Sequence, residues 1–293
     1  MIPAHVLREL RYLEISTARA IRTARVGPYT SRTRGAGFDF DQHLPYRPGD
    51  DVRRIDWNVT ARLNSPFVRQ THAERELDVI IAVDASRSMA VGGGQYSKKE
   101  VLTFVTGSLL FSAAGDQINT GFLAFADRVL AWSPPRRASG RSWHILEELW
   151  DIEPPATRTA LVPALRHLAT NLRTMSVVVI VSDFFVEDDL FDRPELRTLA
   201  ATHDVIAVVV EDPVHGTLPQ GSGYARVRDV ESGAAAVVAL NARTRRAYLA
   251  AADTRRRQFA SDCYRLGMEC AFVQPGASVM QPIIDLFARR KSA

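Results

Sequence analysis

The sequence predicts an α/β protein built on a doubly wound, mostly parallel sheet with helices on both faces. Three runs made almost only of aliphatic residues, 79–83, 177–181 and 205–210, indicate strands buried on both sides. Segments of helical periodicity separate these runs, which is the order of βαβ units. We expect this domain to span residues 77–290, after an N-terminal helix and an extended segment within residues 1–76.

The N-terminal extension, residues 1–76, is predicted to begin with a basic amphipathic helix. Over residues 4–23 apolar side chains recur on one face, and the arginines lie mostly elsewhere. Glycine, serine and threonine dominate residues 27–37, which predicts a loop. Residues 1–37 hold seven arginines and two glutamates. Such a basic segment could meet nucleic acid, acidic lipid or an acidic protein, but basic chains without such partners also carry one.

The main domain is predicted to alternate between helices and strands. Helices are expected over residues 96–114, 143–150, 161–172, 194–201, 243–266 and 279–289. Beside the three long apolar runs, short strands are expected over residues 120–125, 129–132 and 271–273. The turn at Asp127-Arg128 makes the first two of these a hairpin, and a β excursion is expected near residues 224–240.

The composition is that of an ordinary globular protein, with 46% hydrophobic and 24% charged residues over 293 positions. No stretch of about 18 uncharged apolar residues occurs, so we expect no membrane span. The first residues lack the apolar core of a signal peptide, and we therefore expect a cytoplasmic protein. Cys263 and Cys270 form no C-x-x-C pair, which argues against a disulfide framework or a zinc site.

Oxygen-bearing side chains follow two of the predicted strands. Asp84, Ser86 and Ser88 form a D-x-S-x-S motif directly after the first strand, and Asp183 follows the strand at 177–181. In open α/β sheets the carboxyl ends of the strands are where ligands bind. Carboxylates and hydroxyls are hard donors that suit Mg²⁺, Ca²⁺ or Mn²⁺. Asp and Ser are also ordinary residues of a strand-to-helix turn or N-cap, and that structural interpretation stays open.

The order of these pieces resembles the von Willebrand factor A domain. A D-x-S-x-S motif is followed by Thr159 before a helix, and then by an Asp that closes an apolar strand. The resemblance implies a metal-ion-dependent adhesion site, in which an acidic residue of a partner protein completes the shell of the ion. The metal ligands that it implies here are Asp84, Ser86, Ser88, Thr159 and Asp183. Phe184 stands where many relatives have Gly.

A second resemblance comes from the segment PYRPGDDVRRIDWNVTAR, residues 45–62. It is similar to the signature of a bacterial family, the domain-of-unknown-function-58 family, whose members carry this segment ahead of an A-type domain. The resemblance implies a MoxR-type AAA+ ATPase as a partner and a chaperone-like role in assembly or maturation. The alternating charges of the segment favour two hypotheses, a lattice of internal salt bridges or a docking surface.

We expect a non-catalytic, divalent-metal-dependent protein-binding adaptor. Two carboxylates with three neutral hydroxyls leave the ion electrophilic, so that it can accept a carboxylate from a partner. One alternative is metal-dependent hydrolysis, for which no neighbouring general base is evident. The other is nucleic-acid binding by a helix rich in arginine, although no aromatic residues interleave the arginines as a stacking platform would. Those arginines are Arg243, Arg245, Arg246, Arg255, Arg256 and Arg257.

Overall fold

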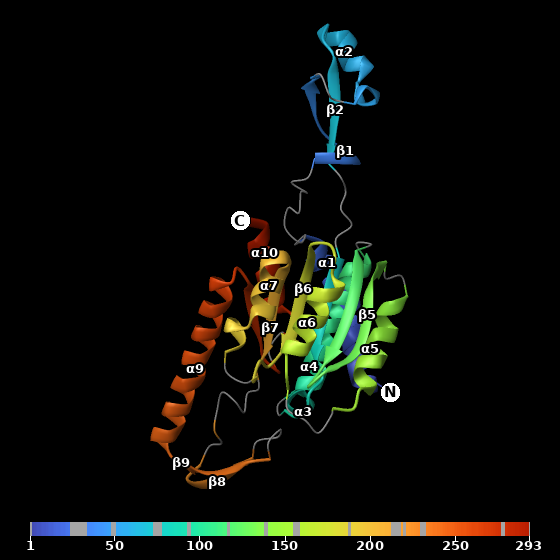
Figure 1. The fold of residues 1–293 in the computed structure, drawn as a ribbon. Coiled ribbons are helices and arrows are strands. Elements are labelled where there is room, and N and C mark those ends of the chain that lie inside the picture. The colour runs from blue at the N-terminus through green and yellow to red at the C-terminus, as the bar shows by residue number, and fades with distance from the viewer. Residues whose placement is uncertain are drawn as a thin grey trace. The chain divides into compact units, whose positions relative to one another are not determined.

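The structure is a computed structural model, and the chain in it divides into two compact units (Figure 1). One unit comprises Met1–Arg25 with Leu77–Ala293, and the other comprises Val26–Glu76. The structure describes residues 2–23, 34–47, 51–72, 78–92, 95–115, 118–137, 140–154, 159–186, 189–211, 218, 221–228, 233–276 and 279–292.

The larger unit is built on a six-stranded sheet in the order β10-β7-β6-β3-β4-β5. All neighbours in this sheet pair in parallel except β4 and β5, which form an antiparallel hairpin. The predicted doubly wound α/β fold is therefore confirmed. The strands are β3 (Asp78–Asp84), β4 (Asn119–Phe125), β5 (Val129–Arg137), β6 (Ser176–Ser182), β7 (Asp204–Val210) and β10 (Glu269–Val273).

Helices pack on both faces of this sheet. The helices of the larger unit are α1 (Ala4–Thr23), α3 (Arg87–Ala90), α4 (Lys98–Gly115), α5 (Arg141–Asp151), α6 (Val162–Asn171), α7 (Pro194–Thr202), α9 (Ala242–Arg265), α10 (Gln281–Ser292) and the 3-10 turn η2 (Leu190–Asp192). None of the described helices is long and apolar enough to cross a bilayer. The excursion near residues 224–240 is an antiparallel hairpin of β8 (Gly223–Arg228) and β9 (Ala235–Leu240).

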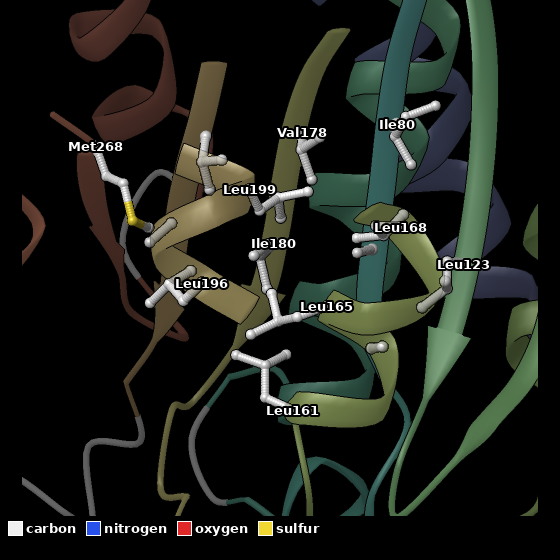
Figure 2. Close-up of a cluster of buried hydrophobic side chains, with 14 of the residues drawn as sticks. Ile80, Leu123, Leu161, Leu165, Leu168, Val178, Ile180, Leu196, Leu199 and Met268 are labelled. Atoms are coloured by element: carbon white, nitrogen blue, oxygen red, sulfur yellow. The ribbon is translucent and has the colours of Figure 1, made fainter. Parts of the chain in front are cut away.

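The central strands are held by aliphatic side chains on both faces. Figure 2 shows one of these faces, where Ile80 of β3 and Ile180 of β6 pack among the leucines of α6 and α7. Burying each such side chain contributes about 1.5–3 kcal/mol to the free energy of unfolding. The alternation of the strand directs the neighbouring residues to the other face. The central strands β3, β6 and β7 are thus covered on both faces.

Helix α4 is almost entirely buried, and α1 packs closely against it. A Cβ at Gly107 of α4 would lie 2.6 Å from Cδ2 of Leu10 in α1, so a larger residue at this position would require the Leu10 side chain to move. Ile2, Val6 and Leu10 are buried with it. The expected N-terminal extension of residues 1–76 includes α1, and that boundary stays a prediction. The structure groups α1 with the sheet.

The smaller unit contains the signature segment. It holds the antiparallel pair β1 (Arg34–Pro45) and β2 (Phe67–His72), the 3-10 turn η1 (Val52–Arg54) and the helix α2 (Trp57–Leu63). Asp51 and Asp56 are the N-caps of η1 and α2, and they accept hydrogen bonds from backbone N–H groups of those turns. The sequence did not predict α2. The Pro48-Gly49 pair of the signature segment, which is typical of a tight turn, lies outside the described residues.

Candidate functional site

The candidate site lies at the carboxyl ends of β3 and β6, the two central strands. These strands pair in parallel with Val83 opposite Val181, so that Asp84 at the end of β3 lies beside the end of β6. Ser182 Oγ donates a hydrogen bond of 2.6 Å to Oδ2 of Asp84 across the two strands. The register of the sheet thus brings together segments about a hundred residues apart in the sequence.

The D-x-S-x-S loop folds around the Asp84 carboxylate. The backbone N–H of Ser86 donates to Oδ1 of Asp84 at 2.9 Å, and Asp84 and Ser86 are both buried. Ser86 occupies the N-cap position of α3, but its side chain makes no capping hydrogen bond. Its Oγ lies 3.1 Å from Oγ of Ser88 instead. The two hydroxyls therefore face each other beside a carboxylate, which the N-cap interpretation does not explain.

Thr159 lies at the same edge of the sheet. The backbone N–H of Ala160 donates to the carbonyl of Ala126 at 2.8 Å, and the N–H of Ala85 donates to the carbonyl of Phe125 at 2.7 Å. These bonds tie the loops that follow β3 and β4 to the segment before α6. Thr159 is buried in this arrangement, with 7% of its surface exposed.

Asp183 is held by a lysine that the sequence analysis did not single out. Lys98 Nζ donates to Oδ2 of Asp183 at 2.9 Å, and the two side chains are 1% and 2% exposed. The backbone N–H of Phe185 donates to Oδ1 of Asp183 at 3.1 Å. One signal could have found the buried lysine, although not its partner. Lys98 is spaced three and seven residues before the buried Val101 and Val105, on the buried face of its helix.

The electrostatics of the site are dominated by burial. Burial and, to a smaller extent, the nearby charge of Asp183 raise the pKa of Asp84 to about 7, against hydrogen bonds from Ser182 and Ser86 that lower it. A carboxyl group in this environment gains from any cation placed beside it. The site therefore favours a positive charge at Asp84.

A groove adjoins the site on the side of α9. Phe184 adopts a left-handed backbone with φ of 52°. Its N–H donates to Ser182 Oγ at 2.9 Å, and its carbonyl accepts from Arg255 at 3.0 Å. The Arg255 guanidinium also stacks 3.4 Å from the centre of the Phe185 ring. Phe184, Phe185, Arg255 and Phe259 are among the side chains that line a cavity of about 890 Å³.

The donor set fits a hard divalent ion in part. Asp84, Ser86 and Ser88 supply a carboxylate and two hydroxyls in one loop, and Thr159 adds a hydroxyl at the same edge. No group of three or more His, Cys, Asp or Glu suited to a metal occurs in the described part of the chain, so hydroxyls would have to complete any shell. Asp183 lies at this edge too, and both of its oxygens accept protein hydrogen bonds, as do both oxygens of Asp84.

The strand order, with carboxylates at the ends of two central neighbours, defines a von Willebrand factor A-like domain. The chain belongs to the family described as "Protein of unknown function DUF58", which residues 42–258 match. The predicted family is therefore confirmed. An uncharacterized protein of Mycobacterium tuberculosis is 32% identical over 226 residues, which cover 76% of this chain and 70% of that relative.

Solved structures of similar fold include the conserved hypothetical protein BatB of Bacteroides thetaiotaomicron. It is 18% identical with a TM-score of 0.50, and the match covers 74% of this chain and 100% of that chain. The VWA domain of SpRpn10 is 11% identical with a TM-score of 0.42, over 75% of this chain and 98% of that chain. At this identity BatB supports the fold alone. The family is described as one of unknown function, and neither the mycobacterial relative nor BatB bears the name of an enzyme.

Proposed function

We propose that the chain is a non-catalytic adaptor that binds a partner protein through a divalent ion. The observation that carries the proposal is the pair of hydroxyls of Ser86 and Ser88, 3.1 Å apart beside the buried carboxylate of Asp84. Asp84, Ser86 and Ser88 would hold Mg²⁺, or Ca²⁺ or Mn²⁺, and Thr159 and Asp183 would contribute directly or through water. The ion would supply an electrophilic centre that accepts a carboxylate from the partner.

The bonding of the two carboxylates favours binding over hydrolysis. A general base must be within hydrogen-bond reach of the proton that it removes. Asp84 already accepts from Ser182 and from the backbone of Ser86. Asp183 already accepts from Lys98 and from the backbone of Phe185. Neither carboxylate is presented as a base to a bound water, so we rank metal-dependent hydrolysis second.

The arginines of α9 favour a protein partner over nucleic acid, because several of them make contacts within the chain. Arg255 binds the carbonyl of Phe184, and Arg256 pairs with Glu211 at 3.4 Å and lies over the ring of Phe272. Arg257 pairs with Asp253 on the same helix. A groove for nucleic acid would instead need arginines directed at phosphates.

The partner that we propose is a MoxR-type AAA+ ATPase, on the strength of the family to which the chain belongs. Such an ATPase would present an acidic side chain to the ion at the carboxyl edge of the sheet. The chain would then act in chaperone-like assembly or maturation. The exposed basic residues of the β8–β9 hairpin, Arg226 and Arg228, would favour the approach of an acidic surface.

The test is capture of a purified MoxR-type ATPase from the same organism by tagged chain, with Mg²⁺ and with EDTA. Wild type should retain it only with Mg²⁺, and Asp84→Ala should not retain it under either condition. Asp127→Ala is the matched control, because Asp127 lies in the β4–β5 turn and pairs with Arg128. Equal retention under all conditions would refute the metal bridge. If a different protein is captured from a lysate with Mg²⁺ and released by EDTA, only the assignment of an ATPase as the partner would be refuted.

A further inference from the structure

Lys98, the first residue of α4, is buried inside the candidate site. Its side chain is 1% exposed, and its ammonium lies 2.9 Å from Oδ2 of Asp183. The centre of the Phe185 ring lies 6.0 Å from Nζ. A lysine is almost never fully buried unless it is paired, because removing an ammonium from water is costly. The Asp183 carboxylate is therefore already paired with a cation, the ammonium of Lys98.

The charges of the site show why this cation matters for a metal. Two carboxylates, Asp84 and Asp183, would balance a divalent ion completely if no other charge were present. Lys98 adds a positive charge at bonding distance from one of them. The ion would then leave one net positive charge in a place shielded from water, and this is unfavourable until an anion joins. An acidic side chain of a partner is an anion of that kind.

We propose that Lys98 is a resident cation that competes with a divalent ion for the Asp183 carboxylate and keeps the ion affinity of the unpartnered chain low. This inference rests on the metal site of the proposed function and adds to it the residue that sets its affinity. Lys98 acts through Asp183 and needs no contact with the ion itself. The ordinary alternative is an ion pair that only stabilises the fold.

The experiment measures binding of Mn²⁺ to the full chain by isothermal titration calorimetry, without any partner. Lys98→Met removes the charge and keeps a similar length and apolar stem. Lys98→Arg keeps the charge. Lys99→Met is the matched control, because Lys99 follows on the same helix but its ammonium lies 5.1 Å from the centre of the Trp150 ring.

Lys98→Met should bind Mn²⁺ roughly 10- to 100-fold more tightly than wild type, since it removes a charge repulsion in a medium of low effective dielectric constant. Lys98→Arg and Lys99→Met should bind as wild type does. The double variant Lys98→Met/Asp183→Asn should lose the gain, because the carboxylate that the lysine released is gone. Unchanged or weaker binding by Lys98→Met would overturn the inference.

Loss of the buried ion pair could unfold Lys98→Met in the absence of metal, so its melting temperature is also followed against Mn²⁺ concentration. A steeper rise than in wild type would support competition, because a ligand stabilises the state that binds it. Failure to fold at any Mn²⁺ concentration would overturn the inference, since the ion would not replace the ammonium.

If Lys98→Met gains affinity for Mn²⁺ but capture of the partner does not depend on Mg²⁺, the inference stands and the proposed function is refuted. If capture depends on Mg²⁺ but Lys98→Met gains no affinity for Mn²⁺, the proposed function stands and the role of Lys98 is refuted.

Discussion

Ser182 donates a hydrogen bond to Asp84 and accepts one from the backbone of Phe184, at 2.6 and 2.9 Å. Its hydroxyl thus joins the ends of β3 and β6 and orients one oxygen of the candidate ligand. Ser182 is the last residue of β6. In the structure it is the link between the D-x-S-x-S loop and the loop that carries Asp183.

Ser182→Ala should lower the free energy of unfolding by about 1–3 kcal/mol, because it leaves a buried carboxylate oxygen without its donor. Ser142→Ala is the control. The buried hydroxyl of Ser142 has no hydrogen-bond partner within the described part of the chain. Its removal should be nearly neutral or stabilising. Urea unfolding of both variants in EDTA gives the comparison, and an equal loss in both would contradict the role of Ser182.

The metal-free protein should lose stability as the pH rises from about 4 to about 7. The pKa of Asp84 is raised in the folded chain to about 7 from its usual 3.8, so the folded state holds a proton that the unfolded state has released. The stabilisation is complete below the unfolded pKa and is lost as the pH passes through the folded one. The loss should be on the order of 4 kcal/mol.

Urea unfolding in EDTA at several pH values measures how the free energy of unfolding changes with pH. This change should be smaller in Asp84→Asn than in wild type. At pH 8 the metal-free Asp84→Asn protein should also be more stable than wild type, because the buried amide carries no charge. A wild-type slope that persists in Asp84→Asn would assign the effect to another group.

Phe184→Gly should be more stable than Phe184→Ala, by about 1 kcal/mol, against the usual order of these residues. The reason is the left-handed backbone at this position, with φ of 52°. Both variants should be less stable than wild type, because the buried ring packs 4.9 Å from that of Phe259. Thermal unfolding of the three proteins is the measurement. A more stable alanine variant would show that the residue relaxes to an ordinary conformation.

Asp56→Ala should unfold α2 and leave the sheet of the larger unit unchanged. Oδ1 of Asp56 accepts from the N–H groups of Asn58 and Val59 at 3.0 and 3.2 Å, and Oδ2 lies 3.0 Å from Nε2 of His43. Hydrogen exchange should show lost protection at the Asn58 and Val59 amides, and Asp56→Asn should retain it because asparagine is an equally good cap. Unchanged exchange in Asp56→Ala would favour the docking hypothesis for residues 45–62.

The sheet and part of the site could be predicted because their signals are local. Aliphatic runs identify strands buried on both faces, and the residue after such a run lies at the carboxyl edge, which placed Asp84 and Asp183. The pairing of Lys98 with Asp183 could not be predicted, because 85 residues separate them and the packing of α4 against the sheet decides the contact. Helix α2 was missed because it has seven residues and depends on a cap more than on periodicity.

The burial of α4 makes the candidate site and α1 mechanically dependent on each other. The helix starts at Lys98 and reaches Gly107, where Leu10 of α1 touches it, after nine residues or about 14 Å. A helix enclosed by close-packed side chains cannot bend freely, so it moves as one rod. A displacement of Lys98 at the first turn would therefore be transmitted along that rod to α1. A change at the candidate site would thus shift α1, although α1 itself does not need to contact the site.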